Sequence, residues 1–336
     1  MPRHVAEIGC GILAGLMATN AILKRQPYDL SGKVVFIAGG SRGLGLVLAR
    51  EFIRRGARIA IAARDPEALS RAVDQLPCGL DDVFSIEADM SMREEAERAV
   101  NQVRERFGRI DVLVNNAGVI AVGPLETMTI DDYRTSLNTH FWAAYFATMA
   151  VLPEMKQRRQ GRIVNISSIG GKVSVPHLLP YCVGKFALTG FSEGLRAELA
   201  KDRIRVTTVC PGLMRTGSPR NAFFKGKNRA EYAWFSLSDA LPILSMSAQR
   251  AGRQIVDACQ RGSAEIVLSL PAKFAVKING IAPVAVSNVM SVVNRVLPSA
   301  GGVGSEARTG SESSSPISPS WLTTLNERAA LQNNEI

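Results

Sequence analysis

Residues 33–45, KVVFIAGGSRGLG, join an apolar run to a glycine-rich turn, and apolar side chains follow the turn at helical spacing. Glycines let a backbone turn tightly and approach a pyrophosphate, which the free N–H groups and the dipole of the next helix attract. The stretch therefore predicts a strand, a phosphate-binding loop and a helix. A plain glycine-rich turn is the alternative, and the strand–loop–helix setting disfavours it.

Six more apolar runs alternate with helix-period segments along the chain. The seven predicted strands are residues 33–38, 58–63, 83–87, 110–115, 162–167, 205–210 and 265–270. Nearly continuous apolar strands are typical of a parallel sheet that helices cover on both faces. The fold class is therefore α/β: a doubly wound, Rossmann-type sheet of seven parallel strands with helices on both faces, plus terminal extensions.

Two helix starts support this division. Asp65 followed by Pro66 predicts an N-cap and a first helical residue, and Ser91 with Glu94 three residues later has the form of a capping box. Ligands of open α/β sheets bind beyond the carboxyl ends of the strands, so the chemistry is expected there.

The end of the second predicted strand indicates which dinucleotide binds. Sheets that bind NAD usually carry an acid there to hold the ribose 2′-hydroxyl, whereas this chain reads Ala62-Ala63-Arg64. Arg64 and Arg42 can make charge-assisted contacts with a 2′-phosphate. NADP is therefore favoured over NAD, with two solvated surface arginines as the alternative.

Three motifs in this order carry a resemblance to a known family. They are the Gly-x-x-x-Gly-x-Gly loop (Gly39, Gly43, Gly45), Asn115-Asn116-Ala117-Gly118 after the fourth strand, and Tyr181-x-x-x-Lys185. Together they resemble the short-chain dehydrogenase/reductase family over roughly residues 31–270. The resemblance implies an NADP(H)-dependent oxidoreductase that moves a hydride between nicotinamide and a carbonyl or alcohol carbon. It also assigns four catalytic residues: Asn138, Ser168, Tyr181 and Lys185.

Carbonyl reduction needs a proton donor beside the developing oxyanion. For Tyr181 to act near neutrality, its pKa would have to fall from about 10 to near 7. Lys185, four residues on and on the same helical face, and the oxidised nicotinamide supply positive charge. The resemblance implies that Ser168 holds the substrate oxygen, and that Asn138 anchors a water linking Lys185 to solvent.

The same resemblance places the cofactor on the loops that follow the strands. Its predicted contacts are Gly39, Ser41, Arg42, Gly43, Leu44, Gly45, Arg64, Asp89, Met90, Asn116, Ala117, Gly118, Tyr181, Lys185, Pro211, Gly212, Met214 and Thr216. The family commonly has Thr where this chain has Ala38, so one side-chain hydrogen bond that stabilises the loop is missing. His177 is interpreted as a solvated loop residue, with substrate contact as the alternative.

Residues 213–246 form the predicted substrate region. It is rich in large apolar side chains: Leu213, Met214, Phe223, Phe224, Tyr232, Trp234, Phe235 and Leu237. Such a lining suits a small apolar carbonyl or alcohol, although the same side chains could simply form helix core. A catalytically silent NADP-binding sensor and an epimerase or dehydratase remain alternatives. The four catalytic residues argue against the first, and the glycine spacing against the second.

Composition narrows the partners and the compartment. The net charge of +10 comes from arginines scattered through helical patterns, without an aromatic-interleaved basic stripe, which argues against nucleic acid. An acidic cofactor or an anionic membrane surface fits better. The five cysteines are far apart and form no Cys-x-x-Cys pair, so neither disulfides nor a metal site is expected. We therefore expect a reducing, cytoplasmic location.

The two ends differ from the middle. Residues 1–30 form an apolar extension in which 8–23 carry no charge; as a helix they would span about 24 Å, short of a bilayer core of about 30 Å. Lys24 and Arg25 follow this run, so we expect it to attach the domain to the cytoplasmic face of a membrane. Packing on the domain or in a homo-oligomer stays open.

The C-terminal end divides into two segments. The apolar segment 271–298 is expected to add a hydrophobic surface beside the substrate entrance. Residues 299–336 are rich in Gly, Ser, Pro and Asn, which predicts a flexible tail, with 321–331 as a candidate docking helix.

Overall fold

The computed structural model describes residues 26–77, 79–315, 318 and 323–336. The apolar run 8–23 lies outside the described residues, so its attachment to a membrane stays a prediction. No helix within the described ranges is both long and apolar enough to cross a membrane.

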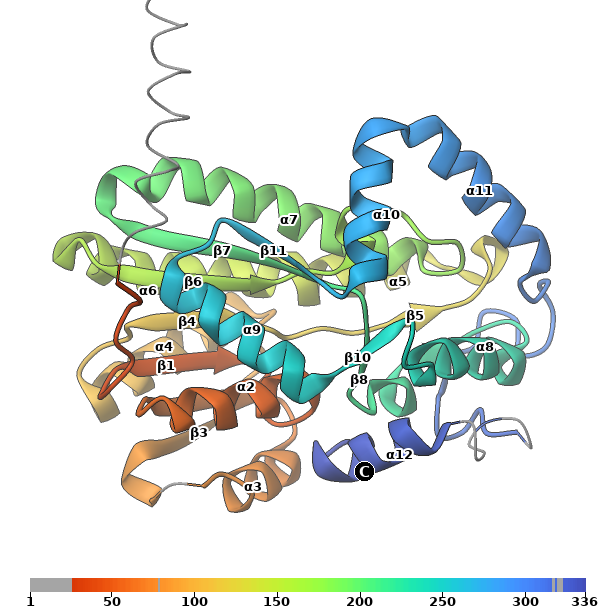
Figure 1. Ribbon diagram of the computed structural model, residues 1–336. Helices are drawn as coiled ribbons and strands as arrows, with labels where there is room; N and C mark the ends of the chain where they lie inside the picture. Colours follow the sequence, from red (N-terminus) through yellow and green to blue (C-terminus); the bar gives the residue numbers. More distant parts are fainter. Residues whose placement is uncertain (1–25, 78, 316–317, 319–322) are drawn as a thin grey trace, which may run out of the picture.

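All seven predicted strands are present and form one parallel sheet (Figure 1). They are β1 (Val34–Ala38), β2 (Arg58–Ala63), β3 (Val83–Glu87), β4 (Val112–Asn115), β6 (Gly161–Ile166), β7 (Ile204–Pro211) and β11 (Glu265–Leu268). Their order across the sheet is β3-β2-β1-β4-β6-β7-β11, so the chain reverses its direction of winding between β1 and β4. This order confirms the doubly wound fold and puts the ligand crevice at the carboxyl ends of β1 and β4.

Helices cover both faces of the sheet. Alternate residues of β1 point to opposite faces: Val35 and Ile37 belong to one buried cluster, Val34 and Phe36 to another. The first cluster is completed by α2 (Gly43–Arg54), α3 (Pro66–Asp74) and α9 (Ala248–Arg261). The second is completed by α4 (Arg93–Phe107), α6 (Ala143–Arg158) and the end of α7 (Leu179–Leu199). Both apolar faces of the strands are therefore removed from water, as their composition predicts.

The helix starts agree only in part with prediction. The carboxylate of Asp65 accepts a hydrogen bond from Ala68 N (3.0 Å), which confirms this residue as the N-cap of α3. The capping box expected at Ser91 is wrong, because α4 begins one residue later with Met92 at its N-cap. Ser91 N and Oγ instead donate to Asp89 Oδ1 (2.9 and 2.7 Å), which closes a turn after β3.

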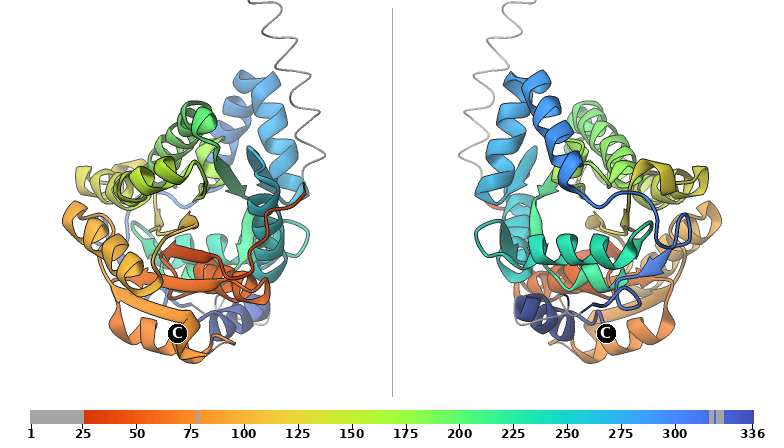
Figure 2. Two further views of the ribbon diagram at one scale, coloured as in Figure 1. Left: turned by 90° about the vertical axis from the view of Figure 1, so that its left-hand side faces the viewer. Right: turned by 90° about the vertical axis from the view of Figure 1, so that its right-hand side faces the viewer.

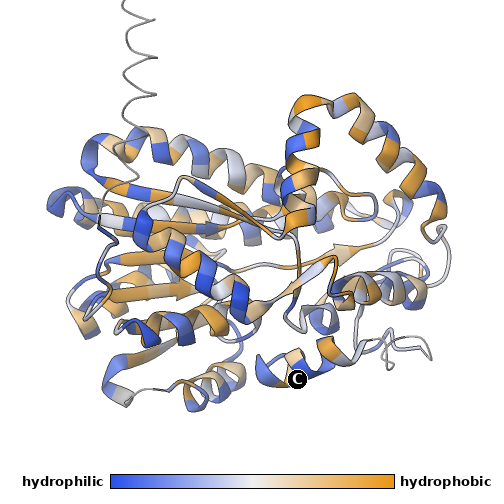
Figure 3. Ribbon diagram, viewed as in Figure 1, coloured by the Kyte–Doolittle hydropathy of each residue, from blue (hydrophilic) through white to orange (hydrophobic). Residues whose placement is uncertain are grey.

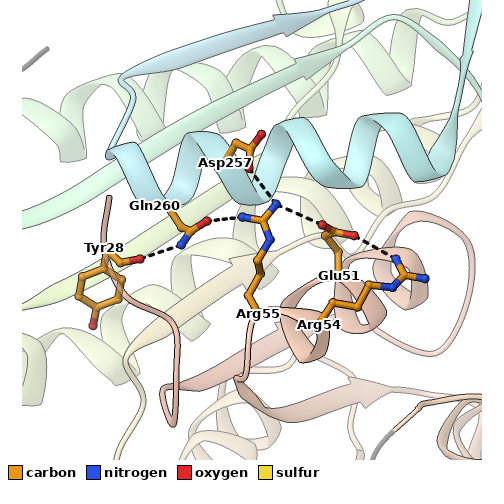
Figure 4. Close-up of polar contacts among 6 residues, drawn as sticks. All are labelled: Tyr28, Glu51, Arg54, Arg55, Asp257 and Gln260. Atoms are coloured by element: carbon orange, nitrogen blue, oxygen red, sulfur yellow. Dashed lines mark hydrogen bonds and ion pairs between the residues drawn. The ribbon is translucent and has the colours of Figure 1, made fainter. Parts of the chain in front are cut away.

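One edge of the first helical layer is held by polar contacts (Figure 4). Arg55, at the end of α2, donates to Gln260 and, at 2.9 Å, to Asp257, both on α9, and it also reaches Glu51 on its own helix. Gln260 in turn donates to Tyr28 O at 2.9 Å. These contacts fasten the chain entering β1 to the helix that precedes the last strand.

Shorter elements build the rim above the carboxyl ends. They are η1 (Leu80–Asp82), β5 (Ala121–Val122), η2 (Leu125–Thr127), α5 (Ile130–Leu137), the π-helical turn η3 (Asn138–Trp142), η4 (Ile169–Gly171), η5 (Ala200–Asp202), β8 (Leu213–Arg215), η6 (Ser218–Asn221), β9 (Phe223–Phe224), α8 (Asn228–Ala240) and β10 (Ser245–Ser247). The pair β8 and β10 is parallel, as are β5 and β9.

The C-terminal segment differs from the flexible tail that its composition predicts. Its strand β12 (Arg308–Thr309) pairs antiparallel with β9. Its helix α12 (Thr324–Gln332) corresponds to the candidate docking helix 321–331, whose first two residues lie outside the described ones, and it lies near α3 (Figures 1 and 2). Asn333, Asn334 and Glu335 are buried. Side-chain hydrogen bonds to the domain, rather than an apolar stripe, hold this end in place.

Helices α10 (Leu270–Ile281) and α11 (Pro283–Val296) form a hairpin that projects from the body of the molecule (Figure 3). The apolar residues it exposes most are Leu270, Phe274, Ile278, Ile281, Val284, Val289, Val292 and Val296. No residue of α11 is buried. A contiguous exposed apolar surface of this kind usually marks an interaction site.

Candidate active site

The glycine-rich loop is fitted closely to the loop that follows β4. Gly39 has φ +81°, and a Cβ there would lie 2.7 Å from Ala117 N and Cα. A Cβ on Gly45 would lie 2.8 Å from Asn116 Nδ2, and this amide donates to Gly39 O at 2.6 Å. The contact ties the two loops together where Ala38 offers no side-chain hydrogen bond. The glycines thus keep a narrow backbone cradle open at the start of α2, which fits a dinucleotide pyrophosphate.

The remaining predicted cofactor residues also lie at the carboxyl ends of the strands. Asp89 and Met90 follow β3, and Met90 is buried. Pro211 and Gly212 stand at the end of β7, Met214 lies in β8, and the buried Thr216 follows it. Within the described ranges, no three His, Cys, Asp or Glu side chains are grouped so as to hold a metal ion.

Arg42 and Arg64 lie beside the cradle, and both are exposed. Among the described residues neither forms an ion pair. The first acid after β2, Asp65, uses its carboxylate to cap α3. Arg42 after β1 and Arg64 after β2 are therefore exposed cations without an ion pair in the described part of the chain, and the nearest acid in sequence, Asp65, is engaged in the cap.

Tyr181 and Lys185 stand one turn apart on α7, and Lys185 Nζ lies 5.7 Å from the centre of the Tyr181 ring. The Tyr181 hydroxyl is hydrogen-bonded to Ser168, which follows β6. Lys185 is buried and donates to Ile166 O at 2.9 Å. The structure thus brings three of the four predicted catalytic residues together.

The charges of this group differ from the expectation. Burial raises the pKa of Tyr181, and the hydrogen bond from Ser168 opposes this only in part. Burial also lowers the pKa of Lys185 to about 7. The expected fall in the Tyr181 pKa is therefore wrong for the protein alone, because desolvation disfavours both charged forms. The phenol is held protonated, ready to donate.

Asn138 does not join the group, since its side chain is exposed at the first residue of the π-helical turn. His140, two residues later, is buried instead and meets the Tyr181 ring edge to face, with ring centres 5.3 Å apart. Its Nε2 lies 2.9 Å from Val119 O, whereas Nδ1 has no hydrogen-bond partner among the described residues. Burial, and then the charge of Lys185, lower the pKa of His140, so its imidazole is neutral.

Sequence reasoning missed His140 because a lone histidine on a helix carries no signal of its own. The π-helical turn from Asn138 to Trp142 rotates the side chains that follow α5, and such turns are frequent at functional sites. A sequence pattern counted at α-helical spacing does not reveal which residue such a turn directs inward.

The interpretation of His177 as a solvated loop residue is also wrong. His177 is buried with φ +63°, and its Nδ1 lies 2.8 Å from Glu231 Oε1 on α8. Trp234 Nε1 donates to the other oxygen of Glu231 at 2.6 Å. A buried carboxylate thus holds the loop before Tyr181 against the rim helix.

A cavity of about 330 Å³ opens next to Tyr181. Its apolar wall comes from Val119, Ala121, Phe223 and Ala307, and its polar side includes Asp132 and Lys225, which form an ion pair at 2.6 Å. The side chain of Ala307 belongs to the predicted tail. This cavity is the candidate substrate site, because Tyr181 is one of the residues that line it.

The predicted substrate region contributes less than expected to this cavity. Phe224, Tyr232 and Phe235 pack with Val122 and Ala222 into a separate buried cluster. Of the eight large residues predicted there, Phe223 is the one that lines the described cavity. The alternative interpretation, that these side chains form core, therefore holds for much of the segment.

Comparisons with known proteins agree with this arrangement. A family model described as short chain dehydrogenase matches residues 33–224. An oxidoreductase of Botryotinia fuckeliana is 32% identical over 243 residues, 72% of this chain and 82% of the relative. The 11-beta-hydroxysteroid dehydrogenase A of Sesamum indicum is 35% identical over 253 residues, 74% and 71% of the two chains.

A solved structure is similar as well. The crystal structure of a short-chain dehydrogenase from Streptomyces avermitilis matches with a TM-score of 0.68 and 30% identity, covering 79% of this chain and 98% of that one. Motifs, sheet order and relatives agree, and the chain therefore belongs to the short-chain dehydrogenase family, oxidoreductases that act on alcohol or carbonyl groups with NAD(P).

Proposed function

We propose that this protein is an NADP(H)-dependent oxidoreductase that interconverts a carbonyl and an alcohol on a mainly apolar skeleton, with Tyr181 as acid and base. The observation that carries the proposal is the position of Tyr181: it lines a cavity, its hydroxyl is hydrogen-bonded to Ser168, and it lies one helical turn from the buried Lys185.

Each side chain has a role that follows from its surroundings. The bound nicotinamide supplies or accepts the hydride. Ser168 orients the substrate oxygen, and Tyr181 gives that oxygen its proton, since burial holds the phenol protonated. Lys185, with a pKa of about 7, takes up or releases a proton near neutrality and so restores the phenol. We assign the fourth position to His140, which contacts Tyr181, and not to the exposed Asn138.

Arg42 and Arg64 support the preference for NADP, since both are exposed and free of ion pairs in the described part of the chain. The test compares dissociation constants for NADPH and NADH in the wild type and in Arg64→Asp. We expect the wild type to bind NADPH more tightly than NADH. In Arg64→Asp the ratio of the two affinities should fall on the order of 10-fold or more, because one charge-assisted contact is removed and one repulsion is added. Equal affinities in the wild type would reject NADP.

The cavity and one relative support an apolar substrate. The cavity wall is apolar on one side, and the sesame relative is named a hydroxysteroid dehydrogenase. The test offers NADPH with a panel of steroid, retinoid and short polar ketones and aldehydes while the absorbance of the reduced cofactor is followed. Turnover of the apolar members separates an oxidoreductase from a silent sensor. Binding without turnover across the whole panel would favour the sensor.

We also propose that the enzyme works at an anionic membrane surface through the α10–α11 hairpin. Its exposed apolar side chains are accompanied by Lys273, Lys277 and Arg295, and no Asp or Glu occurs between Glu265 and Glu306. Apolar side chains with cations alone suit the headgroup region of anionic lipid. Asn279 Nδ2 donates to Lys172 O at 3.0 Å, which ties the hairpin to the loop that follows Ser168.

The test sediments the full chain with phosphatidylserine-containing vesicles and with neutral phosphatidylcholine vesicles. The variant Phe274→Ser with Ile281→Ser should lose most binding to the anionic vesicles, whereas Leu125→Ser, an exposed leucine on η2, should not. Unchanged sedimentation of the hairpin variant would reject the proposal. A change from dimer to monomer in that variant would instead identify a second copy as the occupant.

A further inference from the structure

The last residues of the chain lie on the glycine-rich loop. Ser41, Gly43 and Leu44, three predicted contacts of the cofactor on this loop, are buried in the structure. Asn333, Asn334 and Glu335 are buried too, whereas their neighbours Gln332 and Ile336 are exposed. Buried polar residues need hydrogen-bond partners, and each of these three has at least one, although Asn333 Oδ1 has none among the described residues.

Asn333 joins two cofactor loops. Its main-chain oxygen accepts a hydrogen bond from Gly43 N at 2.8 Å, and its Nδ2 donates to Thr216 O at 3.1 Å. Gly43 N is one of the N–H groups at the start of α2 that have no partner within the helix, the kind of donor that binds a pyrophosphate. In this structure the donor is used by the protein's own chain.

Asn334 fixes the segment in place. Its φ is +59°, a conformation that asparagine tolerates better than most residues. Its Nδ2 donates to Ser41 O at 2.8 Å and to Ala68 O at 2.9 Å, and its Oδ1 accepts from Arg71 Nε at 3.0 Å. These bonds connect the chain end to the loop before α2 and to α3.

Glu335 places its carboxyl group at the same loop. Its Oε1 lies 2.5 Å from the position that a Cβ on Gly43 would occupy, at the first residue of α2. Its Oε2 accepts from Asn221 Nδ2 at 2.6 Å, and Arg42 is the cation that acts on it. The Glu335 carboxyl group therefore occupies space at the N-terminus of α2, where a phosphate group would bind.

We propose that Asn333, Asn334 and Glu335 form an internal competitor of the dinucleotide, with Glu335 as the residue that sets cofactor affinity. The segment takes up Gly43 N and Ser41 O, and the Glu335 carboxyl group lies where a phosphate group would approach Gly43. Cofactor binding therefore requires its release. This inference rests on the proposed binding of NADP(H) at the glycine-rich loop.

The competition depends on pH. Burial raises the pKa of Glu335 to about 7, and the Asn221 hydrogen bond and Arg42 oppose this only in part. Released, the carboxyl titrates near its ordinary value of about 4.3. A raised pKa in the docked state means that docking is strongest at acid pH and weakens as pH rises through about 7. The affinity of the full chain for the cofactor should therefore increase as the pH rises from about 4.3 to about 7.

The experiment measures the dissociation constant of NADPH by calorimetry between pH 5.5 and 8.5. A chain ending at Gln332 should bind NADPH roughly tenfold more tightly than the full chain at the acid end, equal to about 1.4 kcal/mol. It should also lose the part of the pH dependence that Glu335 causes, while titration of the cofactor phosphate remains in both proteins. Asn334→Gly, which keeps the chain length and the backbone conformation, should change affinity in the same direction.

Two controls complete the test. Gln332→Ala, at an exposed residue whose side chain touches Gln249 at 3.5 Å, should leave affinity unchanged. A synthetic peptide of residues 323–336 should raise the apparent dissociation constant of the shortened chain in competition with NADPH.

Equal or weaker NADPH binding by the shortened chain, with its thermal unfolding unchanged, would overturn the proposal and make the segment a wall of the site. If no variant and no wild type bound either dinucleotide, the proposed function itself would fail.

Discussion

Two regions meet at the same crevice and are held by different forces. The sheet of residues 33–268 is built from paired strands between two apolar layers. The C-terminal segment 299–336 reaches the crevice through hydrogen bonds from side chains such as Asn326, Asn333 and Asn334 to backbone oxygens. Apolar layers make a cooperative unit, whereas a few polar contacts can be exchanged for water at small cost. We therefore expect chemistry and global stability to depend on the sheet, and cofactor access to depend on the segment.

The largest effect is expected at the sheet side of the crevice. Tyr181→Phe removes the proton donor but leaves the ring, so turnover should fall on the order of 10³-fold. NADPH affinity should change less than about threefold, since the cradle formed by the glycines and Asn116 is intact. Turnover and calorimetric binding, measured on the same preparation, check both parts. Near-normal turnover would show that another group delivers the proton.

The second prediction concerns global stability. Phe36 in β1 is fully buried, and Phe36→Ala should lower the free energy of unfolding by about 3–5 kcal/mol. The matched control is Phe274→Ala on the exposed face of α10, which should change it by less than about 0.5 kcal/mol. Urea unfolding followed by circular dichroism measures both. Similar values for the two variants would mean that the hairpin is packed in solution.

The contrast also explains what the sequence predicts well. Strands and their faces follow from apolar runs such as residues 34–38, whose alternate side chains enter both layers. Tyr181, Lys185 and the glycines follow from motifs at fixed spacing. The tail composition predicts flexibility because Asn, Ser and Gly show no apolar periodicity. A hydrogen bond such as that from Asn334 to Ser41, which are far apart in the chain, has no sequence signature.

The third prediction separates two residues of one turn. His140→Ala should lower turnover on the order of 10²-fold, because it removes the ring that contacts Tyr181 and shifts the reacting hydroxyl. Asn138→Ala should change it less than about twofold, since this side chain is exposed. The pH profile of turnover is the second readout: it should move in the His140 variant, whose imidazole lies near Lys185, and a purely structural loss would leave it in place.

The reverse ranking, with Asn138→Ala the more damaging, would restore the assignment made from the resemblance. It would also mean that the π-helical turn rearranges when the cofactor binds. The sequence could not predict which of the two residues contributes more to turnover, because both lie in the π-helical turn, where the spacing of side chains departs from the α-helical pattern.

The smallest effect is expected in the C-terminal segment. Glu327 of α12 pairs with Arg220 at 2.7 Å, and both side chains are 28% exposed. Exposed pairs contribute about 0.2–1 kcal/mol, so Glu327→Ala should leave the urea midpoint of the domain nearly unchanged. Its effect should be local: faster hydrogen exchange of the α12 amides, which open without unfolding the sheet.

NADPH affinity should rise slightly, because a looser α12 releases Asn333 to Glu335 more often. Glu97→Ala, which breaks the exposed Arg93–Glu97 pair on α4, should leave exchange in α12 as it was. A fall in global stability as large as that of Phe36→Ala would instead make the segment part of the cooperative core, and the difference between the two regions would disappear.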